Sequence, residues 1–223
     1  MTTQQFDPRE VPVTQVDQHL RAVSRETMQP DALRQRFAAP PPWQPELVTE
    51  KKFMDRLPTQ AAVLVPIVMR SEPTVLLTLR TSHLSTHSGQ IAFPGGKLDA
   101  SDANAEAAAL REAREEVGLT ADFVEVLGQL PVYVTGSVFH VTPVVALVLP
   151  DFSLVPNVHE VADVFEVPLH FLMNPAHHRH HQVDWQGVQR EWLSMPYQDG
   201  TTERFIWGAT AGMLRNFYRF LRA

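Results

Sequence analysis

The sequence predicts an α/β (α+β) protein with a mixed β-sheet between helices. Segments rich in β-branched residues interleave with amphipathic helical segments, without the regular βαβ repeat of a parallel sheet. The chain has 223 residues, 44% of them hydrophobic, and can therefore bury one sizeable core. We expect one main domain over residues 57–223, preceded by a leader over residues 1–56.

The leader is polar and contains no apolar stretch of the kind found in a secretory signal peptide. We expect a short helix over Val16–Met28. The proline-rich segment Ala38–Trp43 is expected to be a stiff linker, because proline fixes the backbone angle φ. The sequence leaves open whether the leader is an ordered flap packed on the main domain or a loose tail.

The main domain is expected to contain five strands, because β-branched and aromatic residues are enriched in short runs between turn residues. These are Ala61–Met69, Val75–Arg80, Phe123–Leu130, Val138–Leu149 and Val161–Val167. Apolar residues at helical spacing predict a helix over 103–117. The C-terminal part is expected to form a short helix over Pro168–Met173, a hairpin within Gln182–Met195 that turns near Gln186–Gly187, and a helix over Trp207–Phe220.

Composition excludes several classes of protein. The formal net charge of −6 argues against a general nucleic-acid binder. The absence of cysteine excludes thiol catalysis, disulfides and cysteine-ligated metal sites. No apolar run reaches the length of about eighteen residues that a membrane-spanning helix needs. We expect a cytoplasmic protein with a small-molecule partner and neither nucleic-acid nor membrane partners, and a homodimer is left open.

Three acidic residues on the predicted helix indicate a divalent-metal site. At 100° per residue, Glu116 lies about 40° from Glu112 around the helix axis, and Glu115 lies about 60° from Glu112 on the opposite side. The opposite stripe, which is expected to pack on the core, contains Ala103, Ala107, Leu110, Ala113 and Val117. The carboxylates then crowd together in water and repel one another unless a cation such as Mg²⁺ or Mn²⁺ neutralises them. A solvated acidic helix face is the alternative interpretation.

Residues around this helix favour the metal interpretation. Asp102 is placed to cap the helix N-terminus, and Gly118 is placed to end the helix as a left-handed residue. The glycines of Gly95–Gly96 allow the backbone to approach a ligand closely, and a glycine carbonyl can itself bind a metal. Arg111 stands four residues before Glu115, so we expect these two side chains to pair.

The segment Gly95–Leu119, GGKLDASDANAEAAALREAREEVGL, resembles the signature of the Nudix hydrolases. Its second half, Arg111–Leu119, fits that signature. The first half departs from it, because Asp102 stands in place of the usual glutamate and the interval from Gly96 to Arg111 is one residue longer. The resemblance implies a Nudix-type α/β/α sandwich with a mixed β-sheet, and the activity of a Nudix pyrophosphohydrolase.

The resemblance also implies roles for single residues. Glu112 and Glu116 are expected to be the first metal ligands and Glu115 the third, with the Gly96 carbonyl completing the set around Mg²⁺ or Mn²⁺. Because these carboxylates bind the metal, we expect the general base elsewhere, and Glu160 is the candidate. An exposed loop carboxylate is the alternative interpretation of Glu160. The expected catalytic set is Arg111, Glu112, Glu115, Glu116 and Glu160.

A second segment, Val75–Asp99, resembles the stretch that marks the coenzyme A pyrophosphatase branch of the family. Together with FIWGATAGML near the C-terminus, the likeness covers about residues 61–221. Four basic residues here are expected to contact substrate phosphates: Arg80, His83, His87 and Lys97. Structural pairing with neighbouring acids is the alternative for each of them.

The resemblance therefore implies hydrolysis of the diphosphate of coenzyme A and its derivatives to 3′,5′-ADP and 4′-phosphopantetheine. Such a substrate needs cationic groups for its extra phosphate and an apolar channel for its pantetheine arm, which the Phe- and Trp-rich C-terminal half is able to supply. One alternative is a Nudix hydrolase of another nucleoside diphosphate derivative, such as ADP-ribose, a dinucleotide or a modified nucleotide. A non-catalytic Nudix ligand-binding module is the other.

Overall fold

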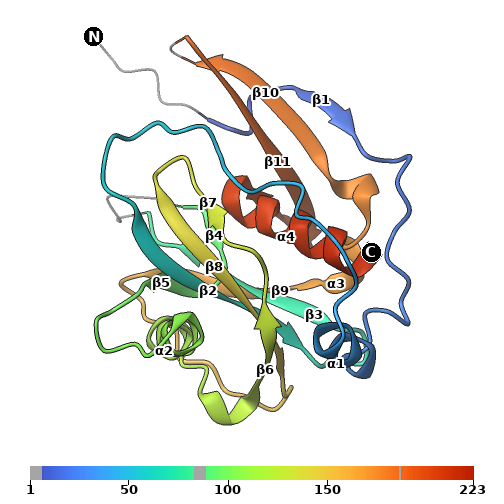
Figure 1. The fold of residues 1–223 in the computed structure, drawn as a ribbon, viewed down its shortest axis with the longest axis vertical. Helices are drawn as coiled ribbons and strands as arrows, with labels where there is room; N and C mark the ends of the chain where they lie inside the picture. Colours follow the sequence, from blue (N-terminus) through green and yellow to red (C-terminus); the bar gives the residue numbers. More distant parts are fainter. Residues whose placement is uncertain (1–6, 83–88, 186) are drawn as a thin grey trace.

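The computed structural model describes residues 7–82, 89–185 and 187–223, which form two β-sheets and several helices (Figure 1). The larger sheet contains β2 (Thr59–Val68), β3 (Thr74–Arg80), β4 (Ile91–Ala92), β5 (Gly95–Lys97), β6 (Val124–Gln129), β7 (Tyr133–Val134), β8 (Phe139–Val148) and β9 (Val161–Pro168). Its central order is β4-β3-β2-β8-β6, with β5 paired to β2, β7 to β8 and β9 to β3.

The smaller sheet is antiparallel and has the order β1-β10-β11-β12. Its strands are β1 (Val13–Val16), β10 (Arg179–Trp185), β11 (Val188–Asp199) and β12 (Thr202–Trp207). Helix α4 (Gly208–Arg222) lies between the two sheets, and α2 (Ala105–Val117) covers the other face of the larger sheet (Figure 1). The predicted class, a mixed α+β fold around a mixed sheet, is confirmed, and the smaller sheet adds a layer that was not predicted.

The larger sheet is mixed because its two central strands run parallel. β2 pairs with β8 in register from Thr59↔Phe139 to Val68↔Val148, whereas the other pairs in this sheet are antiparallel. Both strands are almost continuously buried, as expected for strands whose two faces are covered. Alternate side chains of these strands enter two cores, one shared with α4 and the other shared with α2.

The five predicted strands are all present, with ends within two residues of those expected. The short helix is α3 (Leu169–Leu172), followed by a 3₁₀ turn over Pro175–His177, and another 3₁₀ turn, Ala121–Phe123, precedes β6. The hairpin of β10 and β11 turns at Gly187, whose φ of 74° favours glycine, and Gln186 lies outside the described residues. Strand β12 was not predicted.

The expected leader helix over Val16–Met28 is wrong, because the helix is α1 (Pro30–Ala38). Pro30 is the first helical residue, where its fixed φ favours initiation and its missing N–H costs nothing. Leu33 of α1 is fully buried in the core shared with α4, and β1 pairs with β10. The described part of the leader therefore packs as an ordered flap, while the domain boundary at residue 57 stays a prediction.

Helix α2 begins at a different cap from the one expected. The Asn104 side chain, not that of Asp102, accepts the capping hydrogen bond from the Ala107 N–H at 2.9 Å. Gly118 ends the helix with a φ of 76°, as expected. The fully buried apolar residues are Ala108, Ala109, Ala113 and Val117, whereas Leu110 is only partly buried and Ala103 is exposed before the helix.

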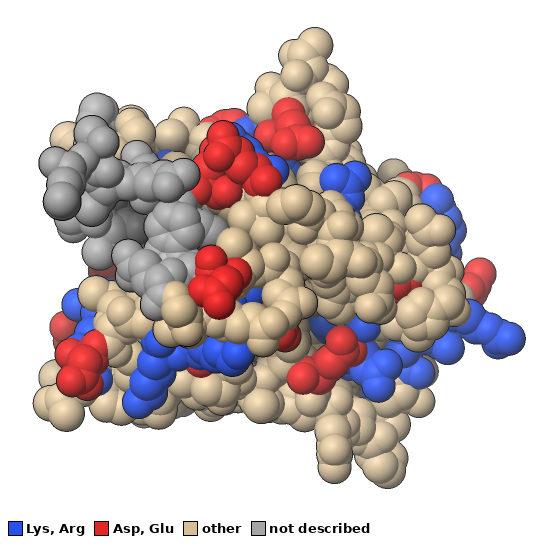
Figure 2. Space-filling view, turned by 90° about the horizontal axis from the view of Figure 1, so that it is seen from above, with Lys and Arg blue, Asp and Glu red and all other residues tan. Residues whose placement is uncertain are grey.

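None of the helices in the described part of the chain is long and apolar enough to span a membrane. On the face shown in Figure 2, basic and acidic side chains of the described residues are interspersed among uncharged ones.

Candidate active site

Arg111 links the loop after β5 to the acidic face of α2. Its guanidinium donates to both Asp102 carboxylate oxygens at 2.9 and 2.8 Å and to the Lys97 carbonyl at 3.1 Å. The same group donates to Glu112 Oε1 at 2.9 Å and to Glu115 Oε2 at 3.0 Å. The expected Arg111–Glu115 contact is therefore present. Hydrogen bonding to Asp102, followed by the bonds to the two glutamates, raises the pKa of Arg111, so this cation stays charged.

Glu116 is buried, which corrects the expectation that all three carboxylates face water. Its residue is 3% exposed, because β5 and β3 cover it. The Gly95 N–H donates to Glu116 Oε2 at 3.1 Å, and Arg80 Nη1 lies 3.3 Å from Oε1. Burial raises the pKa of Glu116 to about 7, although the Gly95 N–H and Arg80 oppose that shift. Helical periodicity predicts the helix face on which Glu116 lies, but it does not predict which distant segment packs on that face.

Glu112 lies against the glycine loop. A Cβ added at Gly96 would lie 2.5 Å from Glu112 Oε1, so any larger residue would displace this carboxylate from its position. Burial raises the pKa of Glu112, and the Arg111 guanidinium opposes the shift. Gly96 therefore lies directly against the Glu112 carboxylate.

Glu160 is brought to these two glutamates by a loop that lies over the end of α2. The Val155 N–H donates to the Val117 carbonyl at 2.9 Å, and the Asn157 N–H donates to the Glu116 carbonyl at 2.8 Å. Asn157 Nδ2 donates to Glu160 Oε1 at 3.2 Å. The negative charge of Glu160 contributes to the raised pKa of both Glu112 and Glu116. Glu160 is half-buried rather than an exposed loop carboxylate.

The donor set fits a hard divalent cation. Glu112 and Glu116 supply carboxylate oxygens in a partly buried place, where their charges repel each other and the charge of Glu160, and a cation would relieve that repulsion. Over the described ranges, no three Asp, Glu or His side chains are already arranged around a metal position. Arg111 holds Glu112 and Glu115, and Arg80 holds Glu116, so metal binding must exchange some of these contacts.

The expected phosphate-binding residues are only partly described. Arg80 forms the structural pair with Glu116 that was the alternative for it, and its Nε is buried without a hydrogen-bond partner in the described part of the chain. The Lys97 residue is exposed at the end of β5. His83 and His87 lie outside the described residues. Contact of these four residues with phosphate stays a prediction.

Sequence reasoning missed a buried charge cluster that joins the leader to α4. Arg215 Nη1 lies 2.9 Å from Asp17 Oδ2, and Arg215 Nε lies 2.9 Å from Glu46 Oε2. The Arg215 and Asp17 side chains are each 3% exposed. Residues this far apart in sequence give no local signal of pairing. The available signal was Arg215 itself, an arginine among the apolar residues of the C-terminal helix, since a charged side chain buried in such a place needs a partner.

Comparison with known proteins shows the family. Residues 58–197 match the family model described as the NUDIX domain. The chain is 41% identical over 182 residues to a Yersinia pestis (strain Pestoides F) protein described as uncharacterized Nudix hydrolase NudL, covering 81% of this chain and 89% of that protein. A Yersinia pseudotuberculosis (serotype O:1b) protein of the same description has the same identity and coverage. The chain therefore belongs to the Nudix family.

Two solved structures with a similar arrangement each overlap with about half of the chain. A C. elegans Ap4A hydrolase in a binary complex is 20% identical with a TM-score of 0.42, covering 50% of this chain and 80% of that one. The M. smegmatis Nudix hydrolase RenU is 26% identical with a TM-score of 0.45, covering 55% and 78%.

Family membership defines the enzyme class. The protein is a Nudix hydrolase that acts on a nucleoside diphosphate derivative, and enzymes of this family generally use divalent metal ions.

Proposed function

We propose that this enzyme hydrolyses the diphosphate of coenzyme A and its derivatives to 3′,5′-ADP and 4′-phosphopantetheine, or the corresponding acyl product, with Mg²⁺ or Mn²⁺. One observation carries the proposal. Arg80 and Gly95, from opposite parts of the segment that resembles the coenzyme A pyrophosphatase stretch, both contact Glu116. The segment that resembles the coenzyme A pyrophosphatase stretch therefore contributes to the carboxylate centre, which supports the proposal.

The proposed roles follow from the contacts. Glu112, Glu116 and Glu115 would hold the metal with the Gly96 carbonyl, and Arg111 positions Glu112 and Glu115. When bound, the metal supplies neutralisation of charge on the diphosphate and acidification of a water.

Two further roles concern the proton and the phosphates. Glu160 accepts the proton of the attacking water, because it lies near Glu112 and Glu116 and, among the described residues, its carboxylate accepts a hydrogen bond from the neutral Asn157 amide and forms no ion pair. Arg80 and Lys97, with His83 and His87, contact the phosphates.

A product assay tests this function. Purified enzyme is given coenzyme A, acetyl-coenzyme A, ADP-ribose, a dinucleoside polyphosphate and nucleoside triphosphates, each with Mg²⁺, with Mn²⁺ or with EDTA. We expect coenzyme A and its thioester to have the highest kcat/KM and to give 3′,5′-ADP, with no turnover in EDTA. A kcat/KM for ADP-ribose or a triphosphate well above that for coenzyme A would instead assign the enzyme to another nucleoside diphosphate derivative.

A further inference from the structure

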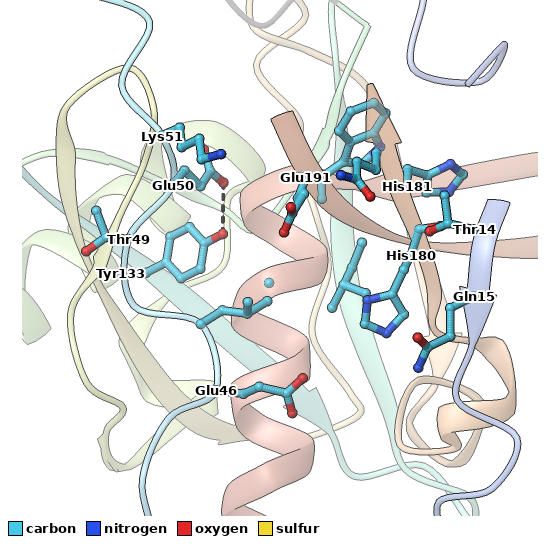
Figure 3. Close-up of a pocket in the computed structure, with 16 residues that line it drawn as sticks. Thr14, Gln15, Glu46, Thr49, Glu50, Lys51, Tyr133, His180, His181 and Glu191 are labelled. Atoms are coloured by element: carbon cyan, nitrogen blue, oxygen red, sulfur yellow. Dashed lines mark hydrogen bonds between the residues drawn. The ribbon is translucent and has the colours of Figure 1, made fainter. Parts of the chain in front are cut away.

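A cleft outside the carboxylate centre is built by the leader, the small sheet and the start of α4 (Figure 3). It contains a cavity of about 370 Å³ and a second of about 270 Å³, which share Glu50, Lys51, Glu191, Trp192 and Gly208. We call it the leader cleft. Glu50 and Tyr133 stand on one wall, Gln15 and His180 stand on the other, and Glu191 lies between them (Figure 3).

One wall of the leader cleft is held rigidly. Tyr133 Oη donates to Glu50 Oε1 at 2.8 Å, and the Gly136 N–H donates to Glu50 Oε2 at 2.8 Å. Burial raises the pKa of Tyr133, so its hydroxyl remains a donor to this carboxylate. A Cβ at Gly212 of α4 would lie 2.5 Å from the Tyr133 hydroxyl, so glycine is needed for the tyrosine to pack there. The Glu50 carboxylate is therefore a fixed part of the cleft.

The charge of the larger cavity disfavours a phosphate. Three carboxylates, those of Glu46, Glu50 and Glu191, line it against one lysine, Lys51. Arg215 neutralises Glu46, but Glu191 is exposed and has no recorded ion pair among the described residues. A phosphate placed there would be repelled by at least two carboxylates. An uncharged group with amide N–H donors suits these acceptors better.

The smaller cavity has three aromatic residues in its lining, beside four charged ones and a glycine. Phe53, Trp192 and Trp207 line it, and the two tryptophan rings meet edge to face with centroids 6.3 Å apart. Arg190 lies over the Phe53 ring at 5.0 Å. Aromatic surface of this kind favours an apolar end of a ligand. The leader cleft thus offers hydrogen-bond acceptors in one part and apolar surface in the next.

The leader cleft is joined to the strand that leads into the carboxylate centre. Thr210, between the cleft residues Gly208 and Gly212, donates through Oγ1 to the Ile91 carbonyl at 3.0 Å. Ile91 stands four residues before Gly95, whose N–H bonds Glu116. At about 3.3 Å per residue, the two Cα atoms are at most about 13 Å apart. The start of α4, which borders the cleft, therefore lies within the reach of a long substrate whose diphosphate is at Glu116.

We propose that the leader cleft binds the uncharged, amide-bearing arm of the diphosphate substrate, with Glu191 accepting from an amide N–H and the aromatic cavity taking the apolar end. This inference rests on the proposed function, under which the arm is pantetheine. The leader would then complete the substrate site, since Glu50, Lys51 and Phe53 precede the residues that match the NUDIX domain.

Calorimetric titration with pantetheine, and separately with 3′,5′-ADP, tests the inference. Glu191→Ala removes an exposed cleft acceptor, and Glu203→Ala makes the same change at an exposed residue of β12 outside the cleft. We expect Glu191→Ala to weaken pantetheine binding about tenfold and to leave 3′,5′-ADP binding unchanged, since one hydrogen bond to a charged group is worth about that factor. Glu203→Ala should change neither. The KM for coenzyme A should rise in Glu191→Ala without loss of kcat.

The outcomes separate this inference from the proposed function. If coenzyme A is not hydrolysed but pantetheine binds in a Glu191-dependent way, the function fails and the ligand class of the cleft stands. If coenzyme A is hydrolysed but pantetheine binds equally to wild type and Glu191→Ala, the inference is overturned and the function stands. Tighter or weaker 3′,5′-ADP binding in Glu191→Ala with no change for pantetheine would make the cleft a nucleotide site and would also overturn it. Trp207→Leu, which removes aromatic surface from the smaller cavity, should also weaken pantetheine binding.

Discussion

A buried histidine is expected to make this protein less stable in mildly acidic solution. His178 is fully buried, with Nε2 2.7 Å from the Leu172 carbonyl and Nδ1 3.0 Å from Arg215 Nη1. A carbonyl only accepts and a guanidinium only donates, so the ring is neutral with its proton on Nε2. A second proton, on Nδ1, would meet the Arg215 cation.

The size of the effect follows from the pKa. Burial, with a smaller contribution from Arg215, lowers the pKa of His178 from 6.5 to about 4. Between these values the unfolded chain binds a proton that the folded chain does not, so stability falls as the pH falls from about 6.5 towards 4. At 1.36 kcal/mol per pKa unit, the loss is about 3 kcal/mol over the whole window and about 2 kcal/mol by pH 5.

His178→Gln isolates this effect, because a glutamine amide also donates and accepts but does not titrate. Urea unfolding of wild type and variant at pH 7.5 and pH 5 gives the change in unfolding free energy for each protein. We expect wild type to lose about 2 kcal/mol more than His178→Gln between these values. The control His19→Gln changes an exposed histidine and should follow wild type. Equal losses in wild type and His178→Gln would refute the reasoning.

Three further predictions concern the active site. Glu112→Gln and Glu116→Gln should each lower kcat at least about 100-fold, because a metal-binding charge is lost. Each should lower the unfolding free energy by less than about 1 kcal/mol, because the shape of the side chain is kept. Full activity of either variant at saturating Mg²⁺ would contradict the assignment. Gly96→Ala should lower kcat/KM about 10- to 100-fold, since its methyl group displaces the Glu112 carboxylate, and wild-type kinetics would show that Glu112 does not need this position. Glu160→Gln should lower kcat at neutral pH and flatten the acidic limb of the pH–rate profile with little change in metal affinity, whereas an unaltered profile leaves the base unassigned.

Local sequence patterns determined most of the secondary structure. The five main strands and the helix with Gly118 at its end follow from side-chain periodicity and turn residues that lie within a few positions of one another. The spacing of Glu112, Glu115 and Glu116 likewise shows that they share one side of α2, and the i, i+4 relation predicts the Arg111–Glu115 contact.

Tertiary structure alone decided how those residues are used. Glu116 is buried because β3 and β5, distant in sequence, supply Arg80 and the Gly95 N–H on the helix face that local periodicity assigns to water. Asn104 caps α2, and Asp102, which was expected to do so, pairs with Arg111 instead. The leader became part of the fold through long-range contacts such as Arg215 with Asp17. Such contacts depend on how segments distant in sequence pack together. A contact between two distant residues produces no periodic pattern in the sequence around either of them, so local patterns do not predict it.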